Sequence, residues 1–543
     1  MPRINVKEIL TDNNFLVGQN ANIRSYHKDI ADFCLPRKSW ITSIRTKGER
    51  VKFNFLYDST AIRSVRNASS GFYSNLTNPA TRWFALETRN KKLMEDLEVR
   101  KWFREVENNL LSTLDGSNFY NIIQEFFLDY ICFGTATFLM LPDVQDGVRF
   151  ISTPVEQINR VEDGRGRLNE IYRNFRLTAR QAINLWGGNA GRSVNEAVIK
   201  KPFQEFEFVH YVGPRHERDE GKTDALNMPF KSVWIAKKDE HLINESGFMS
   251  MPYISEVFYR DSSDPNGFSP TMDVFADIKL ANAVKRTLIR KAMKDTDPPL
   301  NAPAKGYVLP LNFNPAGMNY RDPNLPTDSI ATMPTGPKGS FVIGKDFLEM
   351  IQNDIRDGLF VTLFQSLNAI TKQMPIIEVQ KIIADNMSLL GPVINRATNG
   401  ALGPTIINLF NMKIRNNELP PAPEILEDQE FAPIYLSPLA KAQRSSEIGQ
   451  VEAFMADVQA IGGVLPNAYD KVDEDKTIDL LAKMRGVSSE IMRDDEIIER
   501  MRAHRAEQDA LIAQLQAGQG IASAAKDGAQ AEKAMAEASG GKS

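Results

Sequence analysis

Cysteine and histidine are scarce in this sequence, and it contains no long apolar run. Two cysteines, Cys34 and Cys132, occur among 543 residues. They are too few for a disulfide framework, so we expect both to be reduced in a cytosolic setting. No apolar run approaches the roughly 18 residues that a membrane-spanning helix needs. Residues 1–5 do not begin an apolar signal segment. The sequence therefore predicts a protein that does not act in a membrane.

Motifs for metal binding and catalysis are also missing. Five histidines are present, and none has the spacing of a metal-binding motif: His27, His210, His216, His241 and His504. No CxxC pair occurs, and the carboxylates are too numerous for any pair to be singled out. We therefore expect a protein that is not an enzyme and that has no cofactor and no metal site.

Positive charge is not in excess, since the formal net charge is −4. A protein that grips DNA phosphates over a broad surface needs a basic footprint, so contact with nucleic acid is expected to be weak and non-specific. The hydrophobic fraction of 42% and the charged fraction of 25% are typical of a soluble globular protein. A chain of this length predicts roughly two to four domains.

Helical periodicity dominates, and a strand-rich region lies between residues 148 and 260. The predicted fold class is therefore α+β, mainly α. Residues 1–140 are expected to be mostly helical. Segments such as 206–212 have the β-branched and aromatic content of strands. Residues 162–167 predict a turn between two strands, and Thr178 with Gln181 predicts a helix capping box.

The chain is organised around a long helical hairpin between residues 271 and 370. Its first half carries Ala281, Val284 and Leu288 on one helix face and basic residues on the opposite face. Asp297-Pro298-Pro299 ends this helix, because proline lacks an N–H donor and restricts the residue before it. Periodicity returns at Asp346. The pattern predicts two helices of roughly 30 Å each, joined by a proline-rich segment.

Two local patterns allow a functional and a structural interpretation. Gly339–Lys345 has the spacing of a phosphate-binding loop, which would make the chain a nucleotide hydrolase, but Asp346 stands where a Ser or Thr must reach magnesium. The structural alternative is a strand that turns into the second helix. The clusters Arg82–Phe84 and Lys101–Arg104 could stack on nucleic acid, but such aromatics more often belong to the core. A coiled-coil scaffold is a third alternative, which the absence of sustained heptads disfavours.

Several short motifs follow one another in order along the chain. They are Ala68-Ser69-Ser70-Gly71-Phe72-Tyr73-Ser74-Asn75-Leu76-Thr77-Asn78-Pro79, Trp83-Phe84, Ser117-Asn118-Phe119-Tyr120, Phe133-Gly134-Thr135-Ala136, Asn266-Gly267-Phe268-Ser269-Pro270, Asp277-Ile278-Lys279 and Asp297-Pro298-Pro299. In this order and at these distances, the motifs resemble those of head-to-tail connector (portal) proteins of short-tailed (podovirus-type) tailed bacteriophages. The resemblance extends over about residues 10–510.

The resemblance implies a portal architecture that assembles as a ring. Its parts would be a wing (1–270), a first stem helix (271–295), a clip (296–345), a second stem helix (346–370), a channel loop (371–375), a wing return with a linker (376–436), a helical crown (437–516) and a flexible tail (517–543).

The resemblance also implies a function and partners. The ring, a dodecamer in assembled virions, would stand at one capsid vertex, at the head–tail junction, after assembly in the host cytoplasm. It would conduct double-stranded DNA during genome packaging and ejection. Its expected partners are the terminase large subunit, a tail adaptor protein, and the major capsid and scaffolding proteins.

Three sets of residues are candidates for contacts in such a ring. The channel-loop candidates are Thr371, Lys372, Gln373 and Met374. The stem candidates are Lys279, Arg286, Arg290, Glu349, Asp354 and Asp357, and the clip docking candidates are Lys305, Tyr307, Tyr320, Arg321 and Lys338. Residues 273–295 contain six basic and three acidic residues, whereas 346–370 contain four acidic residues and one basic residue. We therefore expect the basic stem residues to pair with the acidic ones, in the same subunit or the next.

Overall fold

The computed structural model describes residues 4–43, 48–49, 53–88, 90–143, 145–222, 224–261, 264–296, 300–301, 331–332, 341–368, 391–426, 431–435, 451, 454–460, 472–485, 497–498, 500–508, 510, 531 and 533. The chain forms two compact units. Unit 1 comprises Met1–Met94 and Glu98–Ser446, and unit 2 comprises Glu95–Leu97 and Glu447–Ser543. The fold mixes helices and strands, as the sequence predicts, and helices predominate in the first 134 residues.

The core of unit 1 is built around one very apolar helix. Five helices open the chain: α1 (Val6–Gln19), α2 (Ala21–Cys34), α3 (Thr60–Leu76), α4 (Leu97–Gly116) and α5 (Phe119–Phe133). In α5, ten of the 15 residues are buried, so neighbouring elements cover most of this helix. Gly134 ends it in the left-handed conformation (φ 77°), which glycine adopts without steric cost.

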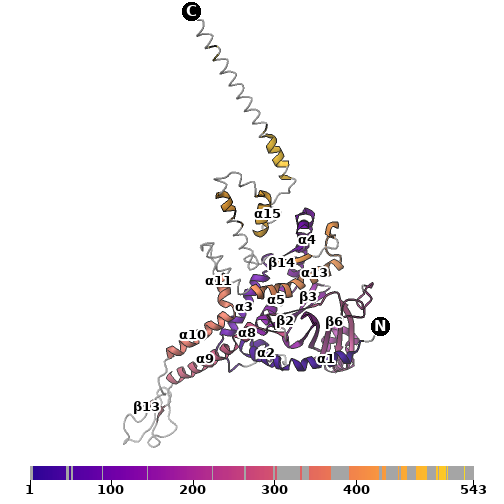
Figure 1. The fold of residues 1–543 in the computed structure, drawn as a ribbon. Coiled ribbons are helices and arrows are strands. Elements are labelled where there is room, and N and C mark those ends of the chain that lie inside the picture. Colours follow the sequence, from indigo (N-terminus) through magenta and orange to yellow (C-terminus); the bar gives the residue numbers. More distant parts are fainter. Residues whose placement is uncertain are drawn as a thin grey trace, which may run out of the picture. The chain divides into compact units, whose positions relative to one another are not determined.

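Two antiparallel sheets lie beside this helical core (Figure 1). The smaller has the order β3-β2-β9, from β2 (Thr135–Asp143), β3 (Gly147–Thr153) and β9 (Tyr253–Val257). The larger has the order β4-β5-β6-β7-β8, from β4 (Ile158–Glu162), β5 (Leu168–Thr178), β6 (Glu205–Pro214), β7 (Phe230–Ala236) and β8 (His241–Phe248). This arrangement confirms the strand-rich region predicted from the sequence.

Helices cover both faces of the larger sheet. Side chains alternate along β6, so Val209 and Tyr211 pack with Ile9 and Leu10 of α1, whereas Phe208 points to the other face. There it meets α6 (Ala179–Trp186) and α7 (Arg192–Lys200). The predicted capping box is present at the start of α6: Thr178 accepts from the Gln181 backbone and the Gln181 side chain reaches back.

A helical hairpin leaves the core after two short strands, β10 (Tyr259–Asp261) and β11 (Asp264–Phe268). It begins with α8 (Pro270–Asp273) and α9 (Phe275–Thr296) and returns through α10 (Phe341–Gly358) and α11 (Val361–Asn368). Between α9 and α10, β12 (Leu300–Asn301) pairs with β13 (Ala331–Thr332). In Figure 1, α9 and α10 extend side by side away from the sheets and α5.

The chain then returns to the core of unit 1. Residues 391–396 are helical, and they lead into a π-helix (η5, Ala397–Leu402) and α13 (Gly403–Arg415). Strand β14 (Phe431–Tyr435) pairs antiparallel with β1 (Phe84–Thr88). In unit 2, the described part contains α15 (Glu474–Arg485), whose Asp475 accepts two hydrogen bonds from Arg502. No described helix has both the length and the apolarity that crossing a membrane requires.

Candidate assembly hairpin

The two helices of the hairpin are held together by an apolar seam. Leu348, Ile351 and Ile355 of α10 are buried, and Val284 and Leu288 of α9 pack against the same core. Two glycines of α10 permit a close approach. A Cβ added to Gly344 would lie 2.7 Å from the Leu288 side chain, and one added to Gly358 would lie 2.3 Å from Val274 Cγ1. Because Gly344 and Gly358 have no side chains, α10 can lie this close to Leu288 and Val274.

The second helix of the hairpin is broken near the core. The sequence pattern predicts one helix over residues 346–370, which is wrong in two respects. The helix begins earlier, at Phe341, and a turn at Leu359–Phe360 separates α10 from α11. Phe360 adopts a left-handed conformation (φ 59°), which is rare for a bulky residue, and its ring lies 6.2 Å from that of Phe258. Packing against the core thus overrides helical periodicity at this point.

The segment before α3 fastens one face of the hairpin. The Asn282 side chain of α9 accepts hydrogen bonds from the backbone N–H groups of Tyr57 (2.7 Å) and Asp58 (3.1 Å) and donates one to the Phe55 carbonyl (2.9 Å). The Asp58 carboxylate accepts from Lys285 of α9 (3.1 Å) and Gln352 of α10 (2.7 Å).

Asp58 is the centre of this attachment. Its side chain is only 4% exposed, and it also accepts a hydrogen bond from the backbone N–H of Thr60 at the start of α3. Burial alone would raise the pKa of Asp58, but its hydrogen bonds to Thr60, Lys285 and Gln352 lower it overall. The carboxylate is therefore charged when it joins α3, α9 and α10.

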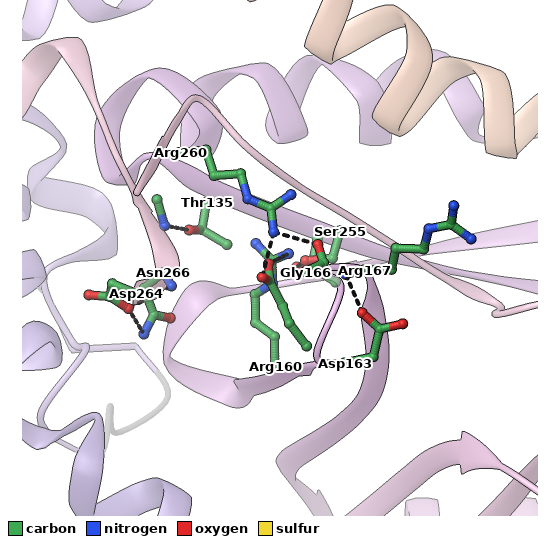
Figure 2. Close-up of polar contacts among 12 residues, drawn as sticks. Thr135, Arg160, Asp163, Gly166, Arg167, Ser255, Arg260, Asp264 and Asn266 are labelled. Carbon is green, nitrogen blue, oxygen red and sulfur yellow. Dashed lines mark hydrogen bonds and ion pairs between the residues drawn. The ribbon is translucent and has the colours of Figure 1, made fainter. Parts of the chain in front are cut away.

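The base of the hairpin is fixed by hydrogen bonds to the end of α5. Ser269 Oγ donates to the Cys132 carbonyl (3.0 Å) and Thr271 Oγ1 donates to the Ile131 carbonyl (2.8 Å). The Gly267 backbone N–H donates to Thr135 Oγ1 (3.1 Å), a contact visible in Figure 2. A Cβ on Gly134 would lie 2.5 Å from the Phe268 backbone. Two of the sequence motifs thus meet at one joint.

Two arginines, Arg160 and Arg260, lie next to this joint and contact the turn that follows β4 (Figure 2). Glu162 accepts from Arg260 Nη2 at 2.7 Å and from Arg160 Nη2 at 3.3 Å, and Arg260 also donates to the Gly166 carbonyl. Asp163 accepts backbone N–H bonds within the same turn, which the sequence predicts at residues 162–167. Backbone hydrogen bonds to Arg167 and Arg165 lower the pKa of Asp163. These contacts connect β10 to the β4–β5 turn.

The predicted stem cations contact other groups of their own chain. Lys279 Nζ lies 3.7 Å from an Asp29 carboxylate oxygen and 4.4 Å from the centre of the Phe275 ring. The Arg286 guanidinium lies 5.7 Å from the centre of the Tyr57 ring, and Arg290 is exposed. Among the described residues, no ion pair joins these cations to Glu349, Asp354 or Asp357. The described part of one chain does not contain these pairs, and pairing with a neighbouring subunit stays a prediction.

Several predicted residues lie outside the part that the structure describes. They are the channel-loop candidates Thr371, Lys372, Gln373 and Met374 and the clip candidates Lys305, Tyr307, Tyr320, Arg321 and Lys338. Gly339 and Ser340 of the predicted phosphate-binding pattern also lie there. The rest of that pattern, Phe341–Lys345, forms the first turns of α10 rather than a strand or a loop. No group of His, Cys, Asp and Glu in the described ranges is suited to hold a metal ion.

The aromatic-basic clusters belong to the core, as their structural interpretation predicts. Trp83 is 1% exposed, Trp102 is 9% exposed, and the Trp102 indole donates to the Pro420 carbonyl. Gly71, within the first motif, lies directly under the Phe364 ring of α11, where a Cβ would be 2.5 Å from the ring. The contacts that Asn282, Asp58 and Gln352 make at the hairpin are not predictable from the sequence, because no local pattern distinguishes these polar residues from surface ones.

Comparison with known proteins gives the family of the chain. Residues 7–492 match the sequence model of the family described as bacteriophage head to tail connecting protein. The chain belongs to this family. It is 28% identical over 499 residues to the probable portal protein of Bordetella phage BPP-1, covering 89% of this chain and 88% of that protein. It is 28% identical over 524 residues to the portal protein of Salmonella phage epsilon15, covering 94% and 93% of the two chains. The family resemblance noted in the sequence is confirmed.

Proposed function

We propose that this protein is a phage portal, a ring of identical subunits at one capsid vertex that conducts double-stranded DNA during packaging and ejection. The observation that carries the proposal is the family match over residues 7–492, together with relatives of nearly equal length that are named portal proteins. The function is structural: the ring passes DNA and holds partners, and it makes or breaks no covalent bond.

The hairpin supports a ring because it is a projecting element with two unlike sides. Residues 273–295 carry a net positive charge and residues 346–370 a net negative charge. A subunit with two different contact surfaces assembles head to tail, and such contacts close into rings when the rotation between subunits permits. In the proposed ring, residues 271–295 and 346–370 are the stem, residues 296–345 are the clip, residues 371–375 are the channel loop, and the described helices of unit 2 belong to the crown.

The charge of the subunit suits a channel that does not retain DNA. Each subunit has a formal net charge of −4, so a ring repels the passing phosphates overall rather than holding them. We assign Lys372 as the charged channel-loop residue, and Lys305, Tyr307, Tyr320, Arg321 and Lys338 as docking residues of the clip. The proposed partners at the clip are the terminase large subunit during packaging and a tail adaptor protein afterwards, and the wing meets the major capsid and scaffolding proteins.

Genetic depletion tests this function. A phage that lacks the chain should accumulate capsids without DNA, and the chain supplied in trans should restore DNA-filled heads. Electron micrographs of restored virions, labelled with an antibody to the chain, should show it at one vertex. DNA-filled, tailed particles formed without the chain would contradict the proposal.

A further inference from the structure

The sides of α9 and α10 that face away from each other carry opposite charge. At 100° per residue, the exposed residues Lys279, Ala283, Arg286 and Arg290 lie opposite Val284 and Leu288, which face the seam. We call these four residues the α9 edge. On α10, the exposed residues Asp346, Glu349, Met350 and Asp357 lie opposite Leu348, Ile351 and Ile355, and we call them the α10 edge.

The hairpin keeps the two edges apart within one chain. The seam lies between the helices, so each edge points away from the other helix, and none of the ion pairs between described residues joins the two edges. The α10 edge also exposes an apolar group, since Met350 is 54% exposed. A surface with charge on both sides of a large apolar side chain is suited to contact another protein.

From these observations we infer that the α9 edge of one subunit packs against the α10 edge of the next subunit. This inference rests on the proposed ring and specifies its stem contact. The two edges are complementary in charge, whereas a two-fold contact of one edge with itself would bring like charges together, which is costly. A second copy of this chain is therefore the occupant that the charges select, and the contact is head to tail.

The register of the hairpin predicts which residues meet. Gly344 lies beside Leu288 and Gly358 beside Val274. In this antiparallel pair, Asp346 is therefore level with Arg286, and Glu349 is level with Ala283. When neighbouring hairpins stand side by side at equal height, Arg286 of one copy meets Asp346 and Glu349 of the next. At the same height the Met350 side chain covers Ala283, whose small side chain leaves room for it.

A charge-swap experiment tests this contact. The variants Arg286→Glu and Glu349→Arg should each raise the protein concentration at which half of the subunits are assembled by ~10-fold or more. The combined variant should recover most of that loss, because the reversed charges meet again across the interface. Arg180→Glu, at an exposed arginine of α6, is the matched control and should leave assembly unchanged. Mass photometry measures assembly, and circular dichroism checks that each monomer is folded.

The outcomes separate this inference from the proposed function. A wild-type protein that forms no closed ring at any concentration contradicts the proposed function, and the inference fails with it. If wild-type rings form and the single variants assemble equally well, the ring stands and the edge contact is wrong. If both single variants fail and the combined variant does not recover, the residues matter but do not pair, which also overturns the inference.

Discussion

Single buried polar residues make the core of unit 1 sensitive to acid and to loss of charge. His27 of α2 is 1% exposed, and neither of its ring nitrogens has a hydrogen-bond partner within the described chain. Lys38, in the 3-10 turn Pro36–Lys38 that follows α2, forms ion pairs at 2.7 Å with both Glu125 and Asp129 of α5. Neither position has a sequence signature, because an isolated histidine or lysine in a helical region is usually exposed.

His27 should make the protein less stable as the pH falls below neutral. Burial lowers the pKa of His27 to about 4, whereas an unfolded chain has a histidine pKa of about 6.5. Between these values the unfolded state binds a proton that the folded state does not, so the free energy of unfolding falls as the pH decreases from 6.5 to 4. The loss approaches about 3 kcal/mol at the acidic end.

Urea denaturation of the wild type and of His27→Met at pH 7 and pH 4.5 measures this effect. The wild type should lose more stability between the two pH values than the variant does. Other groups titrate alike in both proteins, so the difference reports on His27. An equal loss in both proteins would contradict the assignment.

Replacing Lys38 should be more harmful than removing the buried ion pair as a whole. Burial disfavours the charged form of Lys38, but Asp129 and Glu125 outweigh it and raise the pKa of Lys38. Lys38→Met leaves the Asp129 carboxylate, 7% exposed, without its cation, at a cost of about 3 kcal/mol. Lys38→Met combined with Asp129→Leu should lose clearly less, as measured by the urea midpoint. A double variant as unstable as the single one would show that Asp129 is not the partner that matters.

At the scale of elements, the hairpin combines features that the sequence predicts with others that it does not. Periodicity predicts α9 and the inner face of α10, because apolar residues recur with the helical period. The apolar periodicity does not predict the break before α11, because it continues through Leu359 and Leu363. In the structure α10 ends at Gly358 and the Phe360 ring stacks on Phe258. The β12–β13 pair is also missed, because two-residue strands have no period to detect.

Helix α10 comes so close to Val274, the residue between α8 and α9, that Gly358 should tolerate no side chain. Gly358→Ala would place a methyl group 2.3 Å from Val274 Cγ1, and Val274 is itself buried. We expect a loss of about 1–3 kcal/mol in the free energy of unfolding. Gly18→Ala in α1 is the matched control, because nothing lies within 4 Å of the added Cβ; it should be neutral or stabilising. Thermal denaturation of both variants measures these changes in stability. An equal change in the two variants would contradict the close packing at Gly358.

At the scale of the whole molecule, the sequence predicts the fold class and the family, but it leaves open whether the stem charges pair within one subunit or between two. The ordered motifs along the chain are enough to recognise the family. Their residues are required for packing: Gly71 lies under Phe364, and Gly134 lies against the Phe268 backbone. Interfaces between copies leave a weaker trace, since an exposed residue such as Met350 is compatible with either solvent or a partner. The opposite charges of the α9 edge and the α10 edge are what favour a partner over solvent.

The central claim is that the subunit forms a ring around a DNA channel with the hairpins side by side about its axis. Electron cryomicroscopy of the purified full-length protein tests this claim most directly. We expect closed rings with an axial channel wide enough for duplex DNA, in which α9 of each subunit lies next to α10 of its neighbour. Particles without a central channel, or rings whose hairpins point outward and do not touch, would contradict it.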